Sequence, residues 1–550
     1  MKMTLDEQVS FACRRLLSQM NRDSSTSTYG CFDRRFWAWK MTDFPEATFQ
    51  RNLANLAWYL KHSAAQSARE MIGDALIAGL LYTAKIQHRD GSFDQAYPFE
   101  RSYGATGFLL PDLISAYQEV RSFCDEDQKK RVEACLSSAA RFIAGNTEKH
   151  SLISNHLAGA ALGLLKAGSL FDNMVFTDHG KQLIETIISN QSGEGWFPEY
   201  GGADPGYQTL CVHYLAQIFK LEPTKKIEDS LEKSLDFLQY FVHPDGTFGG
   251  EYGSRRTEVY YPGGIALLAD KFPIAAAIHK FMLESIENLR TVTLIDIDMG
   301  NTAPLLSSAI LALKTGNTGA KADRLPHQSD QLSKTFTEAG ITIQSTDVYY
   351  TVLGASNGGV LKIFDKKSKT LFYDDCGALG LTSSGKMITT QSTCLDNVLT
   401  INENKISCES DFFTISNRGA NPINYLALRA LNLTLMRINF LNEVIKKLMV
   451  RWLIKTGDKS SLNRHRDIEF RDTEIGIRDT FSKSGNLKLK SLRQGGKFNA
   501  IHMASSRYYS GPQFTGTKPE ILNYQSLNMN KPLKTSKIIL FGPRAVKSKK

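Results

Sequence analysis

Helical hairpins that recur about every fifty residues are the feature that most constrains how this chain can fold. Segments across residues 1–320 carry apolar residues at three- and four-residue spacing, which predicts successive helices. An acidic residue, a glycine and an aromatic residue recur in the loops, at Asp90-Gly91-Ser92-Phe93, Glu194-Gly195-Trp196-Phe197 and Asp245-Gly246-Thr247-Phe248. Stacked antiparallel hairpins with their loops on one face explain this pattern. The sequence therefore predicts an α/α toroid, with an open solenoid as the alternative.

A different pattern begins near residue 335. Segments such as GITIQST and DIEFRDTEIGIRDTF alternate polar with β-branched and aromatic residues between turns. They predict an antiparallel β-sandwich over residues 335–550, ending in a basic tail at Arg544–Lys550. We place the domain boundary in the polar stretch KTGNTGAKADRLPHQSDQ. Residues 425–454 are apolar but carry charged residues, which argues against a transmembrane helix and favours packing against the sandwich. A basic amphipathic helix on a membrane surface is the alternative.

The overall composition limits the setting in which this chain works. The net charge of +10 suits an anionic partner, although part of the basic excess lies in 446–493 and in the C-terminal tail. The eight cysteines are scattered, which indicates reduced thiols rather than a zinc or disulfide framework. The N-terminal segment offers no secretory apolar core, so we expect a cytoplasmic protein.

Two segments of the helical half are candidates for an active cleft. Asn155 and His156 precede the small-residue helix LAGAALGLL, where backbone N–H groups and the helix dipole favour an anion. The alternative is an Asn that caps the helix beside a surface His. Residues 195–208 are rich in Gly, Pro, aromatic and acidic residues, a composition typical of ligand-binding loops. Tyr207 lies at the start of the following helix, where its phenol could transfer a proton.

Other loop residues are candidates for substrate contacts. Residues 29–40 mix aromatic and basic side chains that suit a sugar-binding wall, or else a strap that closes the toroid. The guanidinium groups of Arg255 and Arg256 could neutralise a carboxylate, unless one of them forms a structural ion pair with Glu251. The residues assigned to substrate binding are Arg34, Trp37, Trp39, Asp90, Glu100, Arg101, Trp196, Glu199, Asp204, Glu251 and Arg255.

These segments together resemble the heparinase II/III-like proteins of polysaccharide gene clusters. The resemblance rests on CFDRRFWAWKMTDFP, DGSFDQAYPFERSYGAT, SNHLAGA, PEYGGADPGYQTL, HPDGTFGGEYGSR, NGGVLKIFD, ALRALNLTL to VRWLI, and RDIEFRDTEIGIRD. It implies a toroid-plus-sandwich polysaccharide lyase that cleaves a uronate-containing polysaccharide by β-elimination. Asn155 would neutralise the uronate carboxylate and Tyr207 would transfer the proton, while His156 and Arg256 are looser matches to catalytic residues.

The resemblance also implies partners and a setting. The partner would be an anionic polysaccharide or oligosaccharide and not nucleic acid. Without an export signal, we expect a role in exopolysaccharide or other surface polysaccharide biosynthesis, with peripheral contact at the inner face of the membrane. No cofactor is expected, while a divalent cation bridging to the sandwich and the oligomeric state stay open.

Several other activities fit the same toroid. A non-catalytic glycan-binding protein would keep the cleft without the chemistry. A uronate C5-epimerase would use the same intermediate as a lyase. A glycoside hydrolase would pair Glu199 with Asp204 or Glu251. A terpenoid-cyclase-like toroid is disfavoured, because the helical half lacks a DxDD acid and an Asp-Cys-His zinc set.

Overall fold

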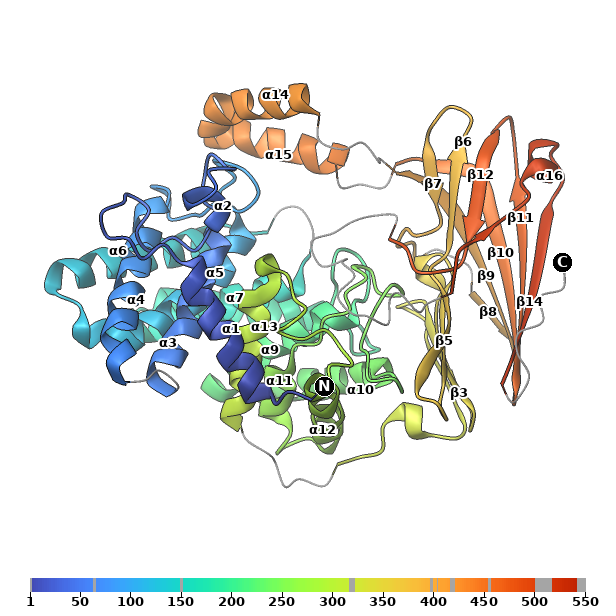
Figure 1. Ribbon diagram of the computed structural model, residues 1–550, viewed down its shortest axis with the longest axis horizontal. Helices are drawn as coiled ribbons and strands as arrows, with labels where there is room; N and C mark the ends of the chain where they lie inside the picture. Colours follow the sequence, from blue (N-terminus) through green and yellow to red (C-terminus); the bar gives the residue numbers. More distant parts are fainter. Residues whose placement is uncertain are drawn as a thin grey trace.

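Helices fill the first part of the molecule and antiparallel sheets the second (Figure 1). The computed structural model describes residues 2–62, 66–148, 152–315, 322–395, 399–402, 404–415, 421–453, 457–499 and 517–541. The α-helices of the first part are α1 (Leu5–Gln19), α2 (Arg34–Trp37), α3 (Asn52–His62), α4 (Gln66–Ile86), α5 (Tyr103–Val120), α6 (Glu126–Gly145), α7 (Ser154–Phe171), α8 (Met174–Ser189), α9 (Pro205–Leu221), α10 (Lys225–Leu238), α11 (Pro262–Leu268), α12 (Pro273–Glu287) and α13 (Met299–Thr315).

The helices form a closed double ring. Helices α3, α5, α7, α9, α11 and α13 pack side by side in this order, and α13 returns to α3. Asn55 on α3 donates its Nδ2 hydrogen to the carbonyl of Ala303 on α13 at 3.2 Å, which joins the two ends of the ring. Helices α4, α6, α8, α10 and α12 lie outside this inner ring, and α1 bridges α12 and α13. The predicted toroid is confirmed and the open solenoid is excluded.

The recurring loops share one backbone geometry. Gly91, Gly195 and Gly246 have φ values of +92°, +97° and +91°, a left-handed conformation that favours glycine. A Cβ atom at Gly91 or Gly195 would lie 2.1 Å from a main-chain oxygen of the neighbouring outer helix, so no side chain fits. Gly30, with φ +93°, adopts the same conformation in a repeat that the sequence pattern did not reveal. The aromatic residues that follow are buried in the core: Phe32, Phe93, Phe197 and Phe248.

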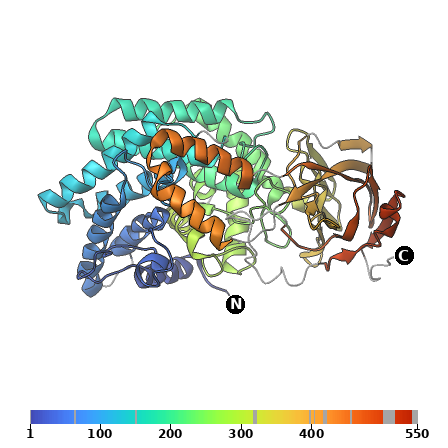
Figure 2. The same ribbon diagram turned by 90° about the horizontal axis from the view of Figure 1, so that it is seen from above.

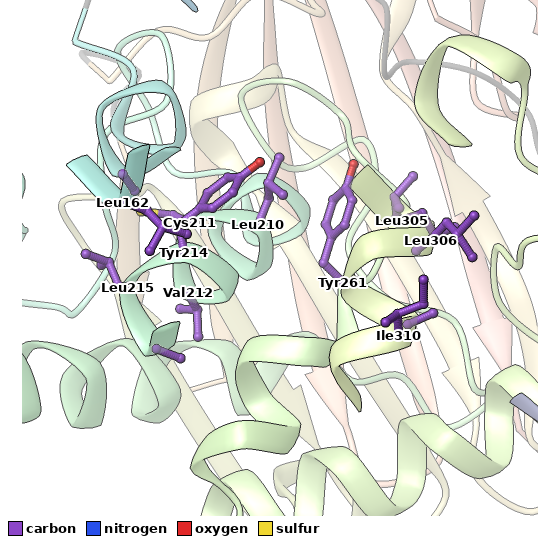
Figure 3. Packing of buried hydrophobic residues seen from close by; sticks show 14 of the residues in the cluster. Leu162, Leu210, Cys211, Val212, Tyr214, Leu215, Tyr261, Leu305, Leu306 and Ile310 are labelled. Carbon is purple, nitrogen blue, oxygen red and sulfur yellow. The ribbon is translucent and has the colours of Figure 1, made fainter. Parts of the chain in front are cut away.

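The centre of the ring contains a buried charge network within an apolar core. The Arg51 guanidinium donates to the Asp112 carboxylate and to the Tyr214 hydroxyl, both at 2.8 Å, which ties the first inner helices to α9. Figure 3 shows apolar side chains of α7, α9 and α13 around Tyr214 and Tyr261. A charge buried here is tolerated because each donor finds an oxygen partner.

Two antiparallel sheets make up the second part of the molecule. The smaller sheet has the order β1 (Leu332–Phe336), β2 (Ile341–Ser345), β3 (Tyr349–Gly354), β4 (Val360–Asp365) and β5 (Thr370–Asp375). The larger sheet has the order β13-β12-β6-β7-β9-β10-β11-β14, with β8 paired to β9. Its strands are β6 (Ala378–Thr382), β7 (Met387–Thr389), β8 (Leu399–Asn402), β9 (Lys405–Ile415), β10 (Lys459–Arg471), β11 (Glu474–Lys483), β12 (Leu489–Gln494), β13 (Glu520–Ile521) and β14 (Leu533–Leu540), and a short helix α16 (Gln525–Asn528) precedes β14.

The smaller sheet is covered on both faces, which explains why β3 is buried along its whole length. Tyr350 and Val352 join the core of the helical domain, whereas Tyr349 and Leu353 pack against the larger sheet. This alternation follows from the two-residue period of a strand. The helical domain, the smaller sheet and the larger sheet therefore form three successive layers, which fixes the sandwich against the toroid.

A helical hairpin interrupts the larger sheet between β9 and β10. It consists of α14 (Pro422–Leu433) and α15 (Asn439–Leu453), and it lies over the helical domain in both views (Figures 1 and 2). The Arg429 guanidinium contacts the Asp43 carboxylate at 3.0 Å, and Asn442 donates to the Phe99 carbonyl at 2.8 Å. The expected packing against the sandwich is thus wrong, because the hairpin's polar groups find their partners on the toroid. Among the described helices, none is long and apolar enough to cross a membrane.

The last toroid helix ends at Thr315 and the first strand begins at Leu332. Residues 316–321 of the predicted boundary stretch, and the basic tail at Arg544–Lys550, lie outside the described residues.

Candidate active site

Loops from three successive repeats meet at the N-terminal ends of α7 and α9. Ile153, just before α7, forms a β-bridge with Glu199, and the Ser154 amide donates to the Pro198 carbonyl at 3.2 Å. The Arg255 amide donates to the Asp204 carboxylate at 2.8 Å, which brings the next loop to the start of α9. Helix N-termini present unpaired N–H groups and a positive dipole end, so this place favours an anionic ligand.

Asn155 is buried and held by one carboxylate. Its backbone amide donates to Oε1 of Glu199 at 2.9 Å, and its side-chain Nδ2 donates to Oε2 of the same residue at 2.7 Å. The side-chain Oδ1 of Asn155 is buried and has no hydrogen-bond partner among the described residues. The residue that caps α7 is Ile153, so Asn155 is not the helix cap. The Nδ2 group is therefore engaged with Glu199, whereas Oδ1 is a buried acceptor without a donor among the described residues, and such a group calls for a functional explanation.

Glu199 is a fully buried carboxyl group without a direct ion pair among the salt bridges of the described residues. Burial raises its pKa to about 8, and the nearby Asp204 adds to this, while the Asn155 hydrogen bonds and Arg255 act in the opposite direction. At neutral pH the carboxyl group is therefore close to its titration point. Strongly shifted groups of this kind are typical of functional sites.

Tyr200 projects from a tight turn beside Arg255. Tyr200 and Gly201 have φ values of +56° and +87°, and Glu199 bridges Gly202 across them, as in a two-residue hairpin turn. A positive φ is strained for tyrosine and marks a position that its surroundings enforce. The Arg255 guanidinium carbon lies 3.6 Å from the centre of the Tyr200 ring. This stacking presents a cation and a phenol together at the edge of the site.

His156 lies in the first turn of α7, next to Asn155. Its Nδ1 is 3.0 Å from a carboxylate oxygen of Glu148, and its ring packs edge-on against Phe108 at 5.0 Å. A Cβ atom on Gly104 would approach the His156 ring to 2.6 Å, so the glycine gives the imidazole its space. The carboxylate and the aromatic ring fix the orientation of the imidazole.

Tyr207 lies in the first turn of α9, above the cap of that helix. The buried Asp204 caps α9 by accepting from the Tyr207 amide at 3.0 Å. The Tyr207 side chain is half-buried and interacts electrostatically with Tyr200. Asp204 also accepts from the Arg255 amide, so it holds two loops together rather than facing a ligand. The structure thus brings Asn155, His156 and Tyr207 to one end of two adjacent helices.

Arg256 and Glu251 lie at the interface with the sandwich. The buried Arg256 guanidinium donates to the Gln391 carbonyl at 2.6 Å. Glu251 accepts from Lys362 at 2.7 Å and lies 3.5 Å from Lys497. Burial would raise the pKa of Glu251, but these two ammonium groups outweigh it and lower the pKa below its ordinary value of 4.5. Both side chains have structural partners, and their predicted roles at the substrate rest on sequence alone.

The same interface holds a group of possible metal ligands. Within the described parts of the chain, Glu251, Asp374 and Cys376 present ligand atoms within 4.8 Å of one another, all buried. The Lys362 ammonium lies 2.7 Å from Glu251 and 3.9 Å from Asp374. A resident ammonium already neutralises these carboxylates, so the cluster does not fit a divalent cation while Lys362 is charged.

The remaining substrate-binding predictions fall into two other regions. Asp90, Glu100 and Arg101 belong to the loop before α5, where Arg101 donates to the Arg437 carbonyl of the hairpin at 3.1 Å. Trp37 on α2 donates to the Gln19 carbonyl at the end of α1 at 2.9 Å, as expected for a strap rather than a sugar-binding wall. Residues Arg34 and Trp39 belong to this strap, and Trp196 is buried with its indole donating to Glu194 at 3.2 Å.

Glu148 and Tyr200 belong to the site but were not predicted from the sequence as separate candidates. Glu148 precedes α7 in a polar stretch with no motif that marks it as a partner of His156. Tyr200 stands between Glu199 and Gly201, and the glycine pair that follows it is the signal for a tight turn that would have singled it out.

An inner ring of helices closed onto a sandwich is the architecture of the toroid-plus-sandwich polysaccharide lyases. Residues 57–265 match the family model of the ulvan lyase N-terminal domain. The match lies within the helical domain, and together with solved structures it confirms the architecture that the resemblance to heparinase II/III-like proteins implied. No curated protein sequence matches the chain.

Solved structures share the fold over most of this chain. The chondroitin AC lyase of Streptomyces coelicolor A3, in complex with chondroitin sulphate, superposes with a TM-score of 0.57 at 10% identity, covering 88% of this chain and 67% of that enzyme. A Paenibacillus xanthan lyase gives a TM-score of 0.54 at 12% identity, and the match covers 88% of this chain and 46% of that enzyme. Heparinase III gives 0.53 at 10% identity, with coverage of 88% and 72%. At these identities the likeness establishes the fold.

Proposed function

We propose that this protein is a polysaccharide lyase that cleaves a uronate-containing polysaccharide by β-elimination. The observation that carries the proposal is the meeting of Asn155, His156 and Tyr207 at the N-terminal ends of α7 and α9, inside a domain that matches the ulvan lyase N-terminal family. The Arg255 guanidinium, stacked on Tyr200, adds a cation at the same place. These groups supply what the elimination needs: carboxylate neutralisation, a base and an acid.

The chemistry follows from the acidity of a uronate. The proton at C5 becomes removable once its neighbouring carboxylate is neutralised, which the Asn155 amide and the Arg255 guanidinium can do. The Tyr207 phenolate removes that proton, the C4–O4 bond breaks, and a C4=C5 double bond forms. The departing oxygen takes a proton from the Tyr207 phenol or from His156. The products are a new hydroxyl end and an unsaturated uronate end.

Glu199 sets the orientation of the Asn155 amide in this proposal. When ionised, it accepts from Nδ2 of Asn155, as observed at 2.7 Å. When protonated, it donates to the Asn155 Oδ1 once the amide turns, and the Nδ2 hydrogens are released toward the substrate carboxylate. The pKa of about 8 keeps the protonated form populated at neutral pH. Protonation of one buried carboxyl group would thus free the donor that neutralises the substrate.

The geometry weighs against a glycoside hydrolase. Asp204 is engaged with the backbone amides of Tyr207 and Arg255, and Glu251 is paired with Lys362. A hydrolase needs two carboxyl groups that flank the bond to be cleaved. Neither candidate partner of Glu199 is available for that role.

The finer parts of the proposal concern substrate and setting. We place the substrate among anionic exopolysaccharides, which the net charge of +10 and the helix N-termini support. All eight cysteines are free, which supports a reducing compartment such as the cytoplasm. A role in surface polysaccharide biosynthesis follows only if such a polymer proves to be the substrate.

The test is a panel of uronate polymers incubated with the purified protein, followed by ultraviolet absorbance of the unsaturated uronate. We expect absorbance to grow with at least one polymer and Tyr207→Phe to reduce the rate by about a hundredfold or more. Tyr59→Phe, which removes a half-buried phenol on α3, is the matched control.

The negative outcomes separate the alternatives. Inverted C5 stereochemistry without chain cleavage, seen by NMR, would identify an epimerase. Binding to a polymer that is unchanged by Tyr207→Phe, with no product from any substrate, would identify a glycan-binding protein and overturn the proposal.

A further inference from the structure

The hairpin α14–α15 carries an unusual share of the exposed apolar surface. Of the 23 large hydrophobic side chains that are exposed among the described residues, nine belong to residues 423–448. We call these nine the hairpin surface: Ile423, Tyr425, Leu426, Leu433, Leu435, Ile438, Phe440, Val444 and Leu448. Large contiguous apolar patches on soluble domains usually mark an interaction site.

The hairpin surface is one side of two amphipathic helices. Exposed residues recur at helical spacing, with Leu426 and Leu433 on α14 and Phe440, Val444 and Leu448 on α15. The buried residues Asn432, Met436, Asn442 and Lys446 alternate with them. The polar side is already occupied, because the hairpin binds the toroid through Arg429 and Asn442, so the apolar side faces outward.

The exposed charged side chains of the hairpin itself are cations. Arg437 and Lys447 are its exposed charged residues among the described side chains of 421–448. The single carboxylate of this stretch, Glu443, is partly buried and lies 3.9 Å from Lys446. An apolar surface with exposed cations complements an anionic lipid headgroup layer, and the half-exposed Asp43 carboxylate beside it is paired with Arg429.

A second segment extends this surface at its edge. Trp39 and Met41 are 66% and 77% exposed, and Lys40 is exposed between them. The Asp43 and Phe44 side chains that follow contact Arg429 of α14, the latter as a cation–π pair at 5.5 Å. An exposed tryptophan beside a lysine is typical of residues that sit at a membrane–water interface.

We infer that the hairpin surface docks the protein onto an anionic membrane. The two helices lie in the plane of the interface, with their apolar side in the headgroup and acyl boundary, while Lys40, Arg437 and Lys447 contact lipid phosphates. The toroid remains on the aqueous side. This inference is independent of the lyase proposal, because it uses none of the residues at the ends of α7 and α9.

The test is sedimentation of the full chain with phosphatidylcholine vesicles and with vesicles that also contain phosphatidylglycerol. The protein should bind the anionic vesicles more tightly. Leu426→Asp combined with Phe440→Asp should weaken that binding at least about tenfold, because two anchors are lost. Arg437→Gln combined with Lys447→Gln should weaken it about fivefold for each charge, and added salt should reproduce that loss.

Phe123→Asp combined with Met174→Asp is the matched control, since these side chains are 70% and 64% exposed elsewhere on the toroid. It should leave vesicle binding unchanged, and circular dichroism should show that every variant is folded. Absence of binding to anionic vesicles would overturn the inference. So would equal losses in the hairpin variant and the control variant. A wild-type dimer in light scattering that the hairpin variant converts to a monomer, without vesicle binding, would assign the surface to a second copy.

Discussion

Two buried glutamates in successive loops of the toroid show opposite behaviour. Glu199 lies against the Asn155 amide and its pKa is raised to about 8, whereas Glu251 lies between Lys362 and Lys497 and its pKa is lowered. Both are buried, so desolvation acts on each in the same direction. The difference comes from the partner: a neutral amide in one case and two ammonium groups in the other.

The contrast separates a structural carboxylate from a responsive one. Glu251 joins the toroid to Lys362 on the smaller sheet, and this ion pair stays charged over the physiological pH range. Among the described residues, Glu199 has no ammonium partner of this kind, and its pKa of about 8 lies near neutrality, next to the residues proposed to act on the substrate. Glu199 lacks the two ammonium neighbours of Glu251, and its raised pKa makes it the better candidate for a functional role.

The strongest way to break the comparison is to remove the nearer of the two cations beside Glu251. Lys362→Met leaves Glu251 and Asp374 buried without their shared ammonium group. We expect the free energy of unfolding to fall by about 3–5 kcal/mol, measured by urea denaturation, because an unpaired buried charge is costly. Lys367→Met, at an exposed position of the β4–β5 turn, should cost less than about 0.5 kcal/mol. A loss below about 1 kcal/mol for Lys362→Met would show that the interface does not depend on this charge.

The next largest effect concerns the partner of Glu199. Asn155→Ala removes the amide that we propose neutralises the substrate carboxylate, and we expect the turnover number on an accepted polymer to fall about 10²–10³-fold. Asn52→Ala, a buried amide on α3 whose Nδ2 donates to the Phe49 carbonyl, is the control for the loss of an amide as such. If Asn155→Ala keeps the activity of the wild type, as Asn52→Ala should, Asn155 takes no part in the chemistry and the contrast between the two glutamates has no catalytic meaning.

Much of this architecture was predictable from the sequence, because it depends on local patterns. The acidic-Gly-aromatic loops predicted the repeat, since the glycine conformation and the buried aromatic residue are encoded within four residues. The predicted closure of the ring rests on the family resemblance rather than on the repeat alone, because closure depends on contacts such as Asn55 with Ala303 that are far apart in the sequence. The repeat around Gly30 was not predicted, because Tyr29 stands where the other loops have an acidic residue, although Phe32 keeps the aromatic position.

The site was predictable in its position and less so in its partners. The helix-start pattern placed Asn155 and Tyr207 at neighbouring helix ends, as the structure has them. The partner of Glu251 lies on β4, more than a hundred residues away, and no local pattern reveals it. The hairpin was predicted to pack against the sandwich, but it packs against the toroid. Its polar partners are also distant in the sequence, and the apolar stretch does not indicate which of them its buried side contacts.

The pH dependence of stability sharpens the comparison. Because the folded pKa of Glu199 lies above its ordinary value of 4.5, the native state keeps a proton that the unfolded chain loses, and stability falls as pH rises from 4.5 toward about 8. Glu199→Gln should remove this decline, at most about 1.4 kcal/mol for each pH unit. Glu251 has a lowered pKa, so its contribution is complete above pH 4.5 and is lost as the pH falls below that value.

Denaturation at a series of pH values tests both signs. The curve of Glu199→Gln should separate from the wild type above pH 4.5, while that of Glu251→Gln should approach the wild type below it. Parallel curves for both variants would mean that neither carboxyl group has a shifted pKa. On an accepted polymer, Glu199→Gln should also keep its activity above pH 8, where the wild type loses the protonated form.

The smallest expected effect tests whether Lys362 and Lys497 stabilise the buried carboxylates independently of each other. Glu258 forms an ion pair with Lys497, which also lies 3.5 Å from Glu251. Glu258→Gln leaves Lys497 with Glu251, so we expect a loss of only about 1 kcal/mol by urea denaturation. Glu284→Gln, which removes an exposed pair with Arg290, should be close to neutral. If Glu258→Gln instead costs as much as Lys362→Met, the interface acts as one network, and the low pKa of Glu251 belongs to the whole cluster rather than to its nearest ammonium.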